Sequence, residues 1–211
     1  MMKDIDFIID CLLHETTEEF FRTRISTKIV KEDDGSTQEF NTLNDICMTE
    51  RNIGKASSYI LKVDDTNHGK IKSSGILLST GTGSTGWLYN ARKANIGYIE
   101  DIMLELGFDA STVSKHVRRT VNDFIFKTND MRMYYYNREM WADPRKRLQL
   151  RDPAIEGFCS TMELKSMCLE GTVVIDGNVA AVMKTGDKIE AKTVAEKQLK
   201  CLRTPENRDY F

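Results

Sequence analysis

A glycine-rich loop carries the clearest chemical signal in the sequence. Residues 81–86 read Gly-Thr-Gly-Ser-Thr-Gly and follow the apolar run 75–78 almost directly. Gly81, Gly83 and Gly86 remove side chains, so that backbone amides can form an anion-binding concavity. Hydroxyl groups surround these glycines, from Thr80, Thr82, Ser84 and Thr85. A diphosphate fits this chemistry.

Three interpretations of the loop compete. Its spacing matches G-x-G-x-x-G, the Rossmann fingerprint, in which an acid about 20 residues further on binds a ribose. Asp101 and Glu105 lie near that distance, but inside a predicted helix and without the required second strand. A P-loop is excluded because Trp87 stands where a lysine must follow the last glycine. The third interpretation is a tight turn whose hydroxyls bond to their own backbone.

Composition and charge narrow the class of protein. The 211 residues are 40% hydrophobic and 29% charged, which is typical of a globular domain. The formal net charge of −2 lacks the basic excess of nucleic-acid-binding domains. The basic runs 114–119 and 143–151 are therefore interpreted as solvated surface. No apolar stretch approaches the ~20 residues that span a bilayer, and no targeting segment is visible. Neither nucleic acid nor a membrane is an expected partner.

The cysteines and histidines predict no metal site. The five cysteines are an odd number without a C-x-x-C pair, so reduced thiols in an intracellular compartment fit best. The three histidines are far apart and lack metal-ligand spacing. These residues are Cys11, Cys47, Cys159, Cys168, Cys201, His14, His68 and His116.

The periodicity of apolar residues predicts strands before and after a pair of helices. An amphipathic helix is expected over 3–21, with a loose tail at 203–211. Strands are expected near 25–29, 42–50, 57–65 and 131–137, with a turn at 66–70. Helices are expected over 87–108, ended by Gly107, and over 110–126, capped by Ser111 or Thr112. A hairpin about Asp176-Gly177 and a turn at 185–187 complete the pattern. This order favours an antiparallel β core with a helical insertion over a parallel sheet.

Three motifs in order resemble those of the NAD kinases. The loop "LSTGTGSTGW" is similar to that family's Thr-Pro-Thr-Gly-Ser-Thr-Ala-Tyr loop, and "TLNDICM" to its Asn-Asp or Asn-Glu motif. The hairpin "VVIDGN", followed by "KTGDKIEA", resembles its Val-Asp-Gly-Gln and Gly-Asp segments. The tryptophan, "KSSG", "ASSYILKVDD" and "RDP" look most like the mitochondrial-type branch. Departures are Gly81 for proline, Gly86-Trp87 for Ala-Tyr, Asn178 for glutamine and Ser74 for a ribose-binding aspartate.

The resemblance implies roles for individual residues. Asn44 and Asp45 would hold the adenosine of NAD, whereas by themselves they suggest a turn before a strand. Residues 80–87 would bind the dinucleotide, with Trp87 either stacked on a ring or in the core. Lys72 would lie near the nicotinamide ribose or a phosphate; the alternative is a solvated charge on a strand edge. Asp176 and Gly177 form a turn, and no residue is assigned a catalytic role.

The resemblance also implies an activity and a domain organisation. The fold would be α+β and β-rich, an antiparallel β-sandwich-like C-terminal domain over 41–211 with a helical insertion near 92–127. Residues 1–40 would form a helix and a linking strand. The reaction moves the γ-phosphoryl group of ATP, with Mg²⁺, to the 2′-hydroxyl of the NAD adenosine ribose, in a homodimer of mitochondrial location. The family's catalytic Gly-Gly-Asp-Gly motif does not occur in the 211 residues. A non-catalytic dinucleotide-binding module or regulatory subunit is the alternative.

Overall fold

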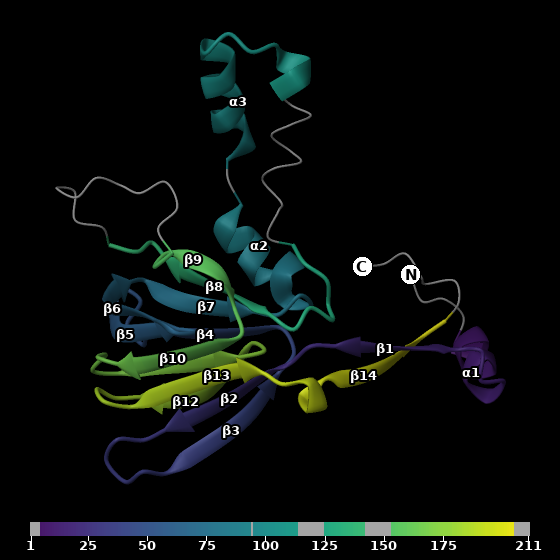
Figure 1. The fold of residues 1–211 in the computed structure, drawn as a ribbon, viewed down its shortest axis with the longest axis horizontal. Coiled ribbons are helices and arrows are strands. Elements are labelled where there is room, and N and C mark those ends of the chain that lie inside the picture. Colours follow the sequence, from purple (N-terminus) through teal and green to yellow (C-terminus); the bar gives the residue numbers. More distant parts are fainter. Residues whose placement is uncertain (1–4, 94, 114–124, 142–152, 205–211) are drawn as a thin grey trace.

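Two six-stranded antiparallel sheets form the body of the computed structural model, which describes residues 5–93, 95–113, 125–141 and 153–204 (Figure 1). The first sheet has the order β3 (Thr37–Thr42), β2 (Ile25–Val30), β13 (Lys188–Thr193), β10 (Thr161–Ser166), β5 (Ser57–Val63) and β6 (Thr66–Ser73). The second has the order β12 (Asn178–Met183), β11 (Gly171–Ile175), β4 (Asp45–Glu50), β7 (Gly75–Ser79), β8 (Met133–Arg138) and β9 (Glu156–Cys159).

The main hydrophobic core lies between these two sheets. In β5, Tyr59 and Leu61 are buried whereas Ile60 and Lys62 are exposed, as the two-residue period of a strand requires. The buried side chains of β5 join those of β4 and β7 in one cluster. The predicted antiparallel, β-sandwich-like architecture is therefore confirmed.

Strand β7 is buried on both faces, which explains its continuous apolar sequence. Ile76 and Leu78 belong to the core between the sheets. Leu77 points to the other face and joins a second cluster with Leu88 of helix α2 (Trp87–Arg92). Because a helix covers its outer face, β7 needs no polar alternation. The glycine loop connects this strand to α2 and contains a 3-10 turn, η1 (Gly83–Thr85).

The helical insertion differs in detail from its prediction. The expected helix over 87–108 is two helices, because the chain leaves helical geometry at Lys93 and α3 (Ile96–Glu105) starts anew with an Asn95 cap. Gly107 follows its end with a φ of 87°, as expected. The next helical turn is capped by Asp109, whose carboxylate accepts from the Ser111 and Thr112 amides, and not by either of those residues. Residues 114–124, including His116, lie outside the described residues, and residues 125 and 126 are not helical.

A two-stranded ribbon extends from the sandwich (Figure 1). It pairs β1 (Glu18–Arg22) with β14 (Leu199–Arg203), after the short turn η2 (Ala195–Lys197), and α1 (Ile5–Leu13) lies at its far end. The prediction of one helix over 3–21 is thus wrong beyond residue 13. Glu15 adopts a φ of 50°, which interrupts the helix, and β1 gains all its backbone partners from a strand 180 residues away. Residues 1–4 and the tail 205–211 lie outside the described residues.

Two predicted turns have opposite outcomes. The turn expected at 66–70 is wrong, because those residues belong to β6 and the reversal occurs at Asp64 and Asp65. Asp64 has a φ of 47°, and its carboxylate accepts hydrogen bonds from the Ser160 and Thr161 amides.

The hairpin at Asp176-Gly177 is confirmed, with φ values of 46° and 82° between the paired strands β11 and β12. Of the two predicted basic runs, 143–151 also lies outside the described residues.

Candidate functional site

The Asn-Asp pair and the glycine loop meet at the ends of two neighbouring strands. Asp45 begins β4 and pairs with Ser79, the last residue of β7. One residue beyond that pair, the Thr80 amide donates to the Asn44 carbonyl over 3.0 Å. The structure therefore brings together the two segments that the sequence analysis assigned to one dinucleotide site, although about 35 residues separate them.

Asp176 holds the Asn-Asp segment in place. Its carboxylate accepts hydrogen bonds from the backbone amides of Leu43, Asn44 and Asp45, at 2.9, 2.7 and 3.2 Å. In return, the Asp176 amide donates to the Asp45 carbonyl over 2.9 Å. Three amides on one carboxylate fix the backbone of a segment that would otherwise be a free loop. The hairpin turn at Asp176 thus also shapes the candidate site, a role that the sequence analysis did not predict.

Asp45 is the electrostatically unusual residue of the site. Its Oδ1 atom is buried and has no hydrogen-bond partner among the described residues. The pKa of this carboxyl is raised to about 6, chiefly by burial; the Ser79 hydroxyl acts to lower it, and the nearby Asp176 carboxylate acts to raise it. That hydroxyl donates to the carbonyls of Asn44 and Thr80. The buried oxygen of Asp45 can accept a hydrogen bond that the described protein does not supply.

The hydroxyls of the glycine loop divide into two groups. The Thr80 hydroxyl donates to the Leu43 carbonyl at 2.5 Å and accepts from the amides of Thr82 and Gly83 at 3.1 and 3.3 Å. The Ser84 hydroxyl donates to the carbonyl of residue 81 over 2.8 Å, and both side chains are buried. These two residues hold the loop, as the turn interpretation predicted. The side chains of Thr82 and Thr85 are not buried in this way.

Close backbone approach accounts for two of the three glycines. A Cβ at Gly83 would lie 2.5 Å from the Asn44 carbonyl oxygen and 2.6 Å from Asp45 Oδ1. A Cβ at Gly81 would lie 2.5 Å from the carbonyl carbon of Lys127. A Cβ at Gly86 would lie 3.5 Å from the Gly83 carbonyl oxygen, which is an ordinary contact. Gly81 and Gly83 are therefore needed because other segments lie against them.

Trp87 lies at the surface and not in the core. Its side chain is 38% exposed, and the guanidinium of Arg138 lies 6.0 Å from its ring centroid. The next residue, Leu88, is fully buried under α2. At the other end of the helix, the Arg92 guanidinium forms a bidentate salt bridge with the Glu156 carboxylate, in which Nη2 donates to Oε1 over 2.7 Å. The helix is thus anchored at both ends while the Trp87 ring remains accessible.

Lys72 lies apart from this cluster. It is an exposed residue of the edge strand β6, opposite Ser58. Its carbonyl accepts from the Trp141 amide over 2.8 Å, but no hydrogen bond or ion pair joins its side chain to the described loop residues. Nearby, the Ser74 hydroxyl donates to the Arg138 carbonyl and contacts the Glu139 carboxylate. The structure brings together the other predicted site residues but not Lys72.

Sequence reasoning missed two groups that contact α2. Arg138 ends β8 and lies over Trp87, and Glu156 begins β9 and binds Arg92, in segments with no motif. No sequence signal could have assigned either, because each meets the helix only through sheet pairing.

We also searched the described residues for a metal site, a membrane-spanning helix and a second binding groove. No group of three or more His, Cys, Asp or Glu side chains that could hold a metal ion occurs in the described ranges. Within the same ranges, no helix is long and apolar enough to cross a membrane. A groove of about 560 Å³ lies on the first sheet, but none of its lining residues belongs to the glycine loop. Its walls carry lysines and glutamates from β2, β10 and β13.

Comparisons with known proteins agree with the motifs. No protein-family model matches the sequence. The chain is 25% identical to mitochondrial NAD kinase 2 of Xenopus tropicalis over 142 residues, 64% of this chain and 32% of the relative. It is 26% identical to the Homo sapiens mitochondrial NAD kinase 2 over 157 residues, 68% of this chain and 34% of the relative. A 57-residue stretch is 40% identical to an NAD kinase of Clostridium tetani, and covers 27% of this chain and 21% of that one.

The fold matches a solved structure as well. A crystal structure of yeast NADH kinase complexed with NADH superposes with a TM-score of 0.66 at 16% identity. The match covers 96% of this chain and 49% of that chain. The chain thus spans about a third of the length of the mitochondrial relatives and about half of the yeast kinase. By the motifs, their spatial meeting and these similarities, the chain resembles the NAD kinases in sequence and in fold.

Proposed function

We propose that this chain is the dinucleotide-binding β domain of an NAD kinase, in which the γ-phosphoryl group of ATP passes to the 2′-hydroxyl of the NAD adenosine ribose. One observation carries the proposal: the bond from the Thr80 amide to the Asn44 carbonyl joins the Asn-Asp pair to the glycine loop. The names of the relatives, NAD kinase and NADH kinase, support the same reaction class.

The residues divide the work of binding. Asn44 and Asp45 contact the adenosine, and the unpaired Oδ1 of Asp45 accepts from a ribose hydroxyl or an adenine amino group. Residues 80–86 form the wall beside the phosphates. The exposed ring of Trp87 stacks on one of the two bases. Lys72 contributes from the edge of the site, near the nicotinamide ribose or a phosphate. Phosphoryl transfer depends chiefly on positioning and charge neutralisation, which such binding supplies.

The catalytic base belongs to a second domain in this proposal. Residues 41–211 form the β domain with its insertion near 92–127, and residues 1–40 form the helix and linking strand. The Gly-Gly-Asp-Gly motif that supplies the base in this family is not in these 211 residues. In this proposal Mg²⁺ accompanies the phosphates of ATP, as is usual in phosphoryl transfer. The assembly is a homodimer, located in mitochondria as the names of the relatives suggest.

Calorimetry with NAD and NADP tests the binding part of the proposal. The chain is expected to bind both weakly, and Asn44→Ala is expected to remove that binding. Unchanged affinity in Asn44→Ala would exclude Asn44 from the site. The second part is tested by incubating the chain with NAD, ATP and Mg²⁺. Little or no NADP is expected from the chain alone, and robust turnover would contradict the need for a second domain.

A second candidate function is a dinucleotide-binding module without turnover. The two functions differ in one inexpensive observation, namely whether the gene encodes an in-frame Gly-Gly-Asp-Gly segment upstream of Met1.

A further inference from the structure

Three segments far apart in the sequence meet beside Thr82. The first is the end of β1, where the Arg22 Nη1 atom donates to the Thr82 hydroxyl over 3.5 Å. The second is residues 125–130, here called the return segment, which lead from the helical insertion back towards β8. The Thr23 amide donates to the carbonyl of Thr128 over 2.8 Å, which joins the first segment to the second. The third is the glycine loop, which the return segment touches at Gly81.

Arg22 brings a positive charge to this junction without a counter-charge. Its side chain is half-buried, and its guanidinium lies 5.5 Å from the centroid of the Phe20 ring. Among the described residues, no carboxylate forms an ion pair with it. Arg203 lies over the same ring at 5.7 Å, but its Nη2 atom pairs with the Glu18 carboxylate at 3.2 Å. The two arginines share one aromatic contact and differ in whether an anion satisfies them.

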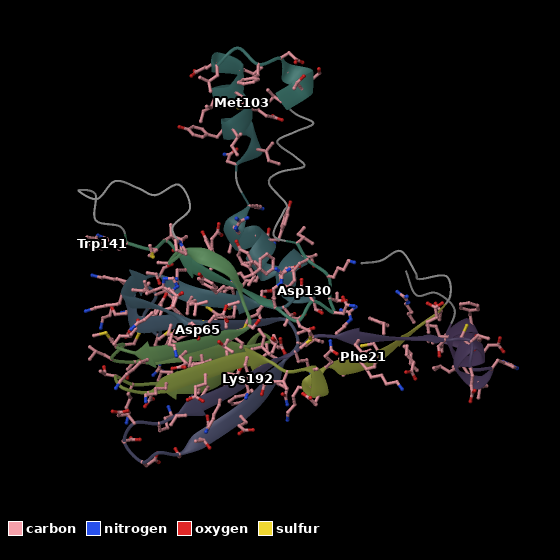
Figure 2. All side chains as sticks on the ribbon, viewed as in Figure 1. Phe21, Asp65, Met103, Asp130, Trp141 and Lys192 are labelled. Atoms are coloured by element: carbon pink, nitrogen blue, oxygen red, sulfur yellow. The ribbon has the colours of Figure 1, made fainter. Side chains whose placement is uncertain are left out.

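Lys127 brings a second charge from the opposite segment. Its carbonyl carbon is the group that would lie 2.5 Å from a Cβ at Gly81, so its backbone rests on the loop. Its side chain is exposed and makes no ion pair with a described carboxylate. The nearest acid in the return segment, Asp130, is engaged by Arg132 through Nε at 3.0 Å and Nη2 at 2.8 Å. Figure 2 labels Asp130 near the base of α2 and Phe21, the neighbour of Arg22, on the ribbon.

We infer that Arg22 and Lys127 bind a phosphate group of the nucleotide at Thr82, an inference that rests on the proposed function. A guanidinium presents paired N–H donors that match phosphate oxygens, and an ammonium adds a compact positive charge. The Thr82 hydroxyl, which already accepts from Arg22, can donate to the same anion. The loop itself carries no lysine, so in this inference both cations come from other segments, the ribbon and the return segment. Ligands with phosphate should use this site, and a nucleoside without phosphate should not.

Charge-removing variants with a matched control test the inference. Arg22→Gln and Lys127→Gln are each expected to weaken NADP binding about tenfold in calorimetry. Arg203→Gln loses the same kind of ring contact and should bind NADP like the unchanged protein. Arg22→Lys keeps the charge and should stay within about threefold of the unchanged protein. Since Lys127 is exposed, its variant should fold normally, which thermal unfolding will verify.

Salt provides a readout that a merely structural role would not move. The losses in Arg22→Gln and Lys127→Gln should shrink as NaCl rises from about 0.05 M to about 0.5 M, because ions screen the charge contact. Equal NADP affinity in the unchanged protein and both glutamine variants would overturn this inference and leave the proposed function standing. An equal loss in Arg203→Gln, or in Arg22→Lys, would also overturn it. A protein that binds neither NAD nor NADP would overturn the proposed function together with this inference.

Discussion

Asp45 shows how one buried carboxyl can link folding to binding. Its unpaired Oδ1 lies 2.6 Å from the place that a Cβ on Gly83 would occupy, and the Asp176 carboxylate is close enough to raise its pKa. Such a group is costly in the folded protein when no donor of the described residues satisfies it. A cost of this kind is consistent with a ligand-binding role, in which the missing donor arrives with the substrate.

Asp45→Asn should therefore change stability in a pH-dependent way. The pKa of Asp45 rises from its ordinary value of 3.8 to about 6 on folding, so the folded state binds the proton more tightly. Ionisation thus lowers the free energy of unfolding as pH rises from about 4 to about 6. Urea unfolding at about pH 7.5 should show Asp45→Asn more stable by about 3 kcal/mol, with little difference near pH 4. The same difference at both pH values would refute the assignment.

Gly81 permits a second test at the scale of one residue. Gly81→Ala places a Cβ against the Lys127 backbone and should lower the free energy of unfolding by about 1–3 kcal/mol. Gly97→Ala is the control, since that glycine lies in α3 with only an ordinary 3.5 Å contact. Alanine there should cause no loss, because it favours helix. Chemical denaturation of both variants would compare them, and equal losses would contradict the close approach at Gly81.

Helix α2 is the element that positions the loop, although it has only six residues. A helix this short is not stable by itself, so its packing must hold it. Leu88 fills the second hydrophobic cluster, and Arg92 contacts both Glu156 and, at 5.6 Å from the ring centroid, Tyr134. Because α2 is fixed to β8 and β9 through Arg92, these two strands also fix the position of Trp87 at its other end.

A double-mutant cycle on Arg92 and Glu156 tests this anchor. The salt bridge is partly buried and bidentate. Its coupling energy should therefore be about 1 kcal/mol, at the upper end of the range for surface ion pairs. The singles Arg92→Gln and Glu156→Gln and the double variant would be compared by urea unfolding. In a Trp141→Phe background, the emission of Trp87 reports the helix directly and should shift in both singles. Additive losses with an unchanged spectrum would show that the pair anchors nothing.

At the scale of the whole molecule, the sandwich encloses its thiols. Cys47, Cys159 and Cys168 are buried. Burial raises the pKa of Cys47 to about 11 and that of Cys159 to about 12, and it also raises that of Cys168. Cys201 lies on the ribbon and is only half-buried. Since the thiolate is the reactive form, the body should be chemically inert and the ribbon reactive.

Thiol labelling at about pH 8 measures this difference. In the native protein Cys201 should react first, and Cys47, Cys159 and Cys168 should react only after unfolding in denaturant. Cys201→Ser should remove the fast phase without changing the free energy of unfolding by more than about 0.5 kcal/mol. A fast phase that persists in Cys201→Ser would mean that the sandwich opens more readily than its packing implies.

The sequence by itself predicted the features that depend on residues close together in the chain. The strand predicted near 57–65 and the Asp176-Gly177 turn depend on neighbouring residues, and both predictions are confirmed, whereas the binding role of the glycine loop stays a prediction. Local patterns failed where distant pairing prevailed, as at β1, which looked helical until β14 supplied its partners.

Only the tertiary structure decided which groups share the site. Sequence motifs placed Asn44 near the loop by resemblance, but they could not show that Asp176 holds its backbone, that Arg22 contacts Thr82 or that the Lys127 backbone lies against Gly81. Contacts between segments so far apart depend on sheet order and register, which no local pattern of side chains encodes. The chemistry of the loop was thus set by its own residues, and the charges around it by the fold.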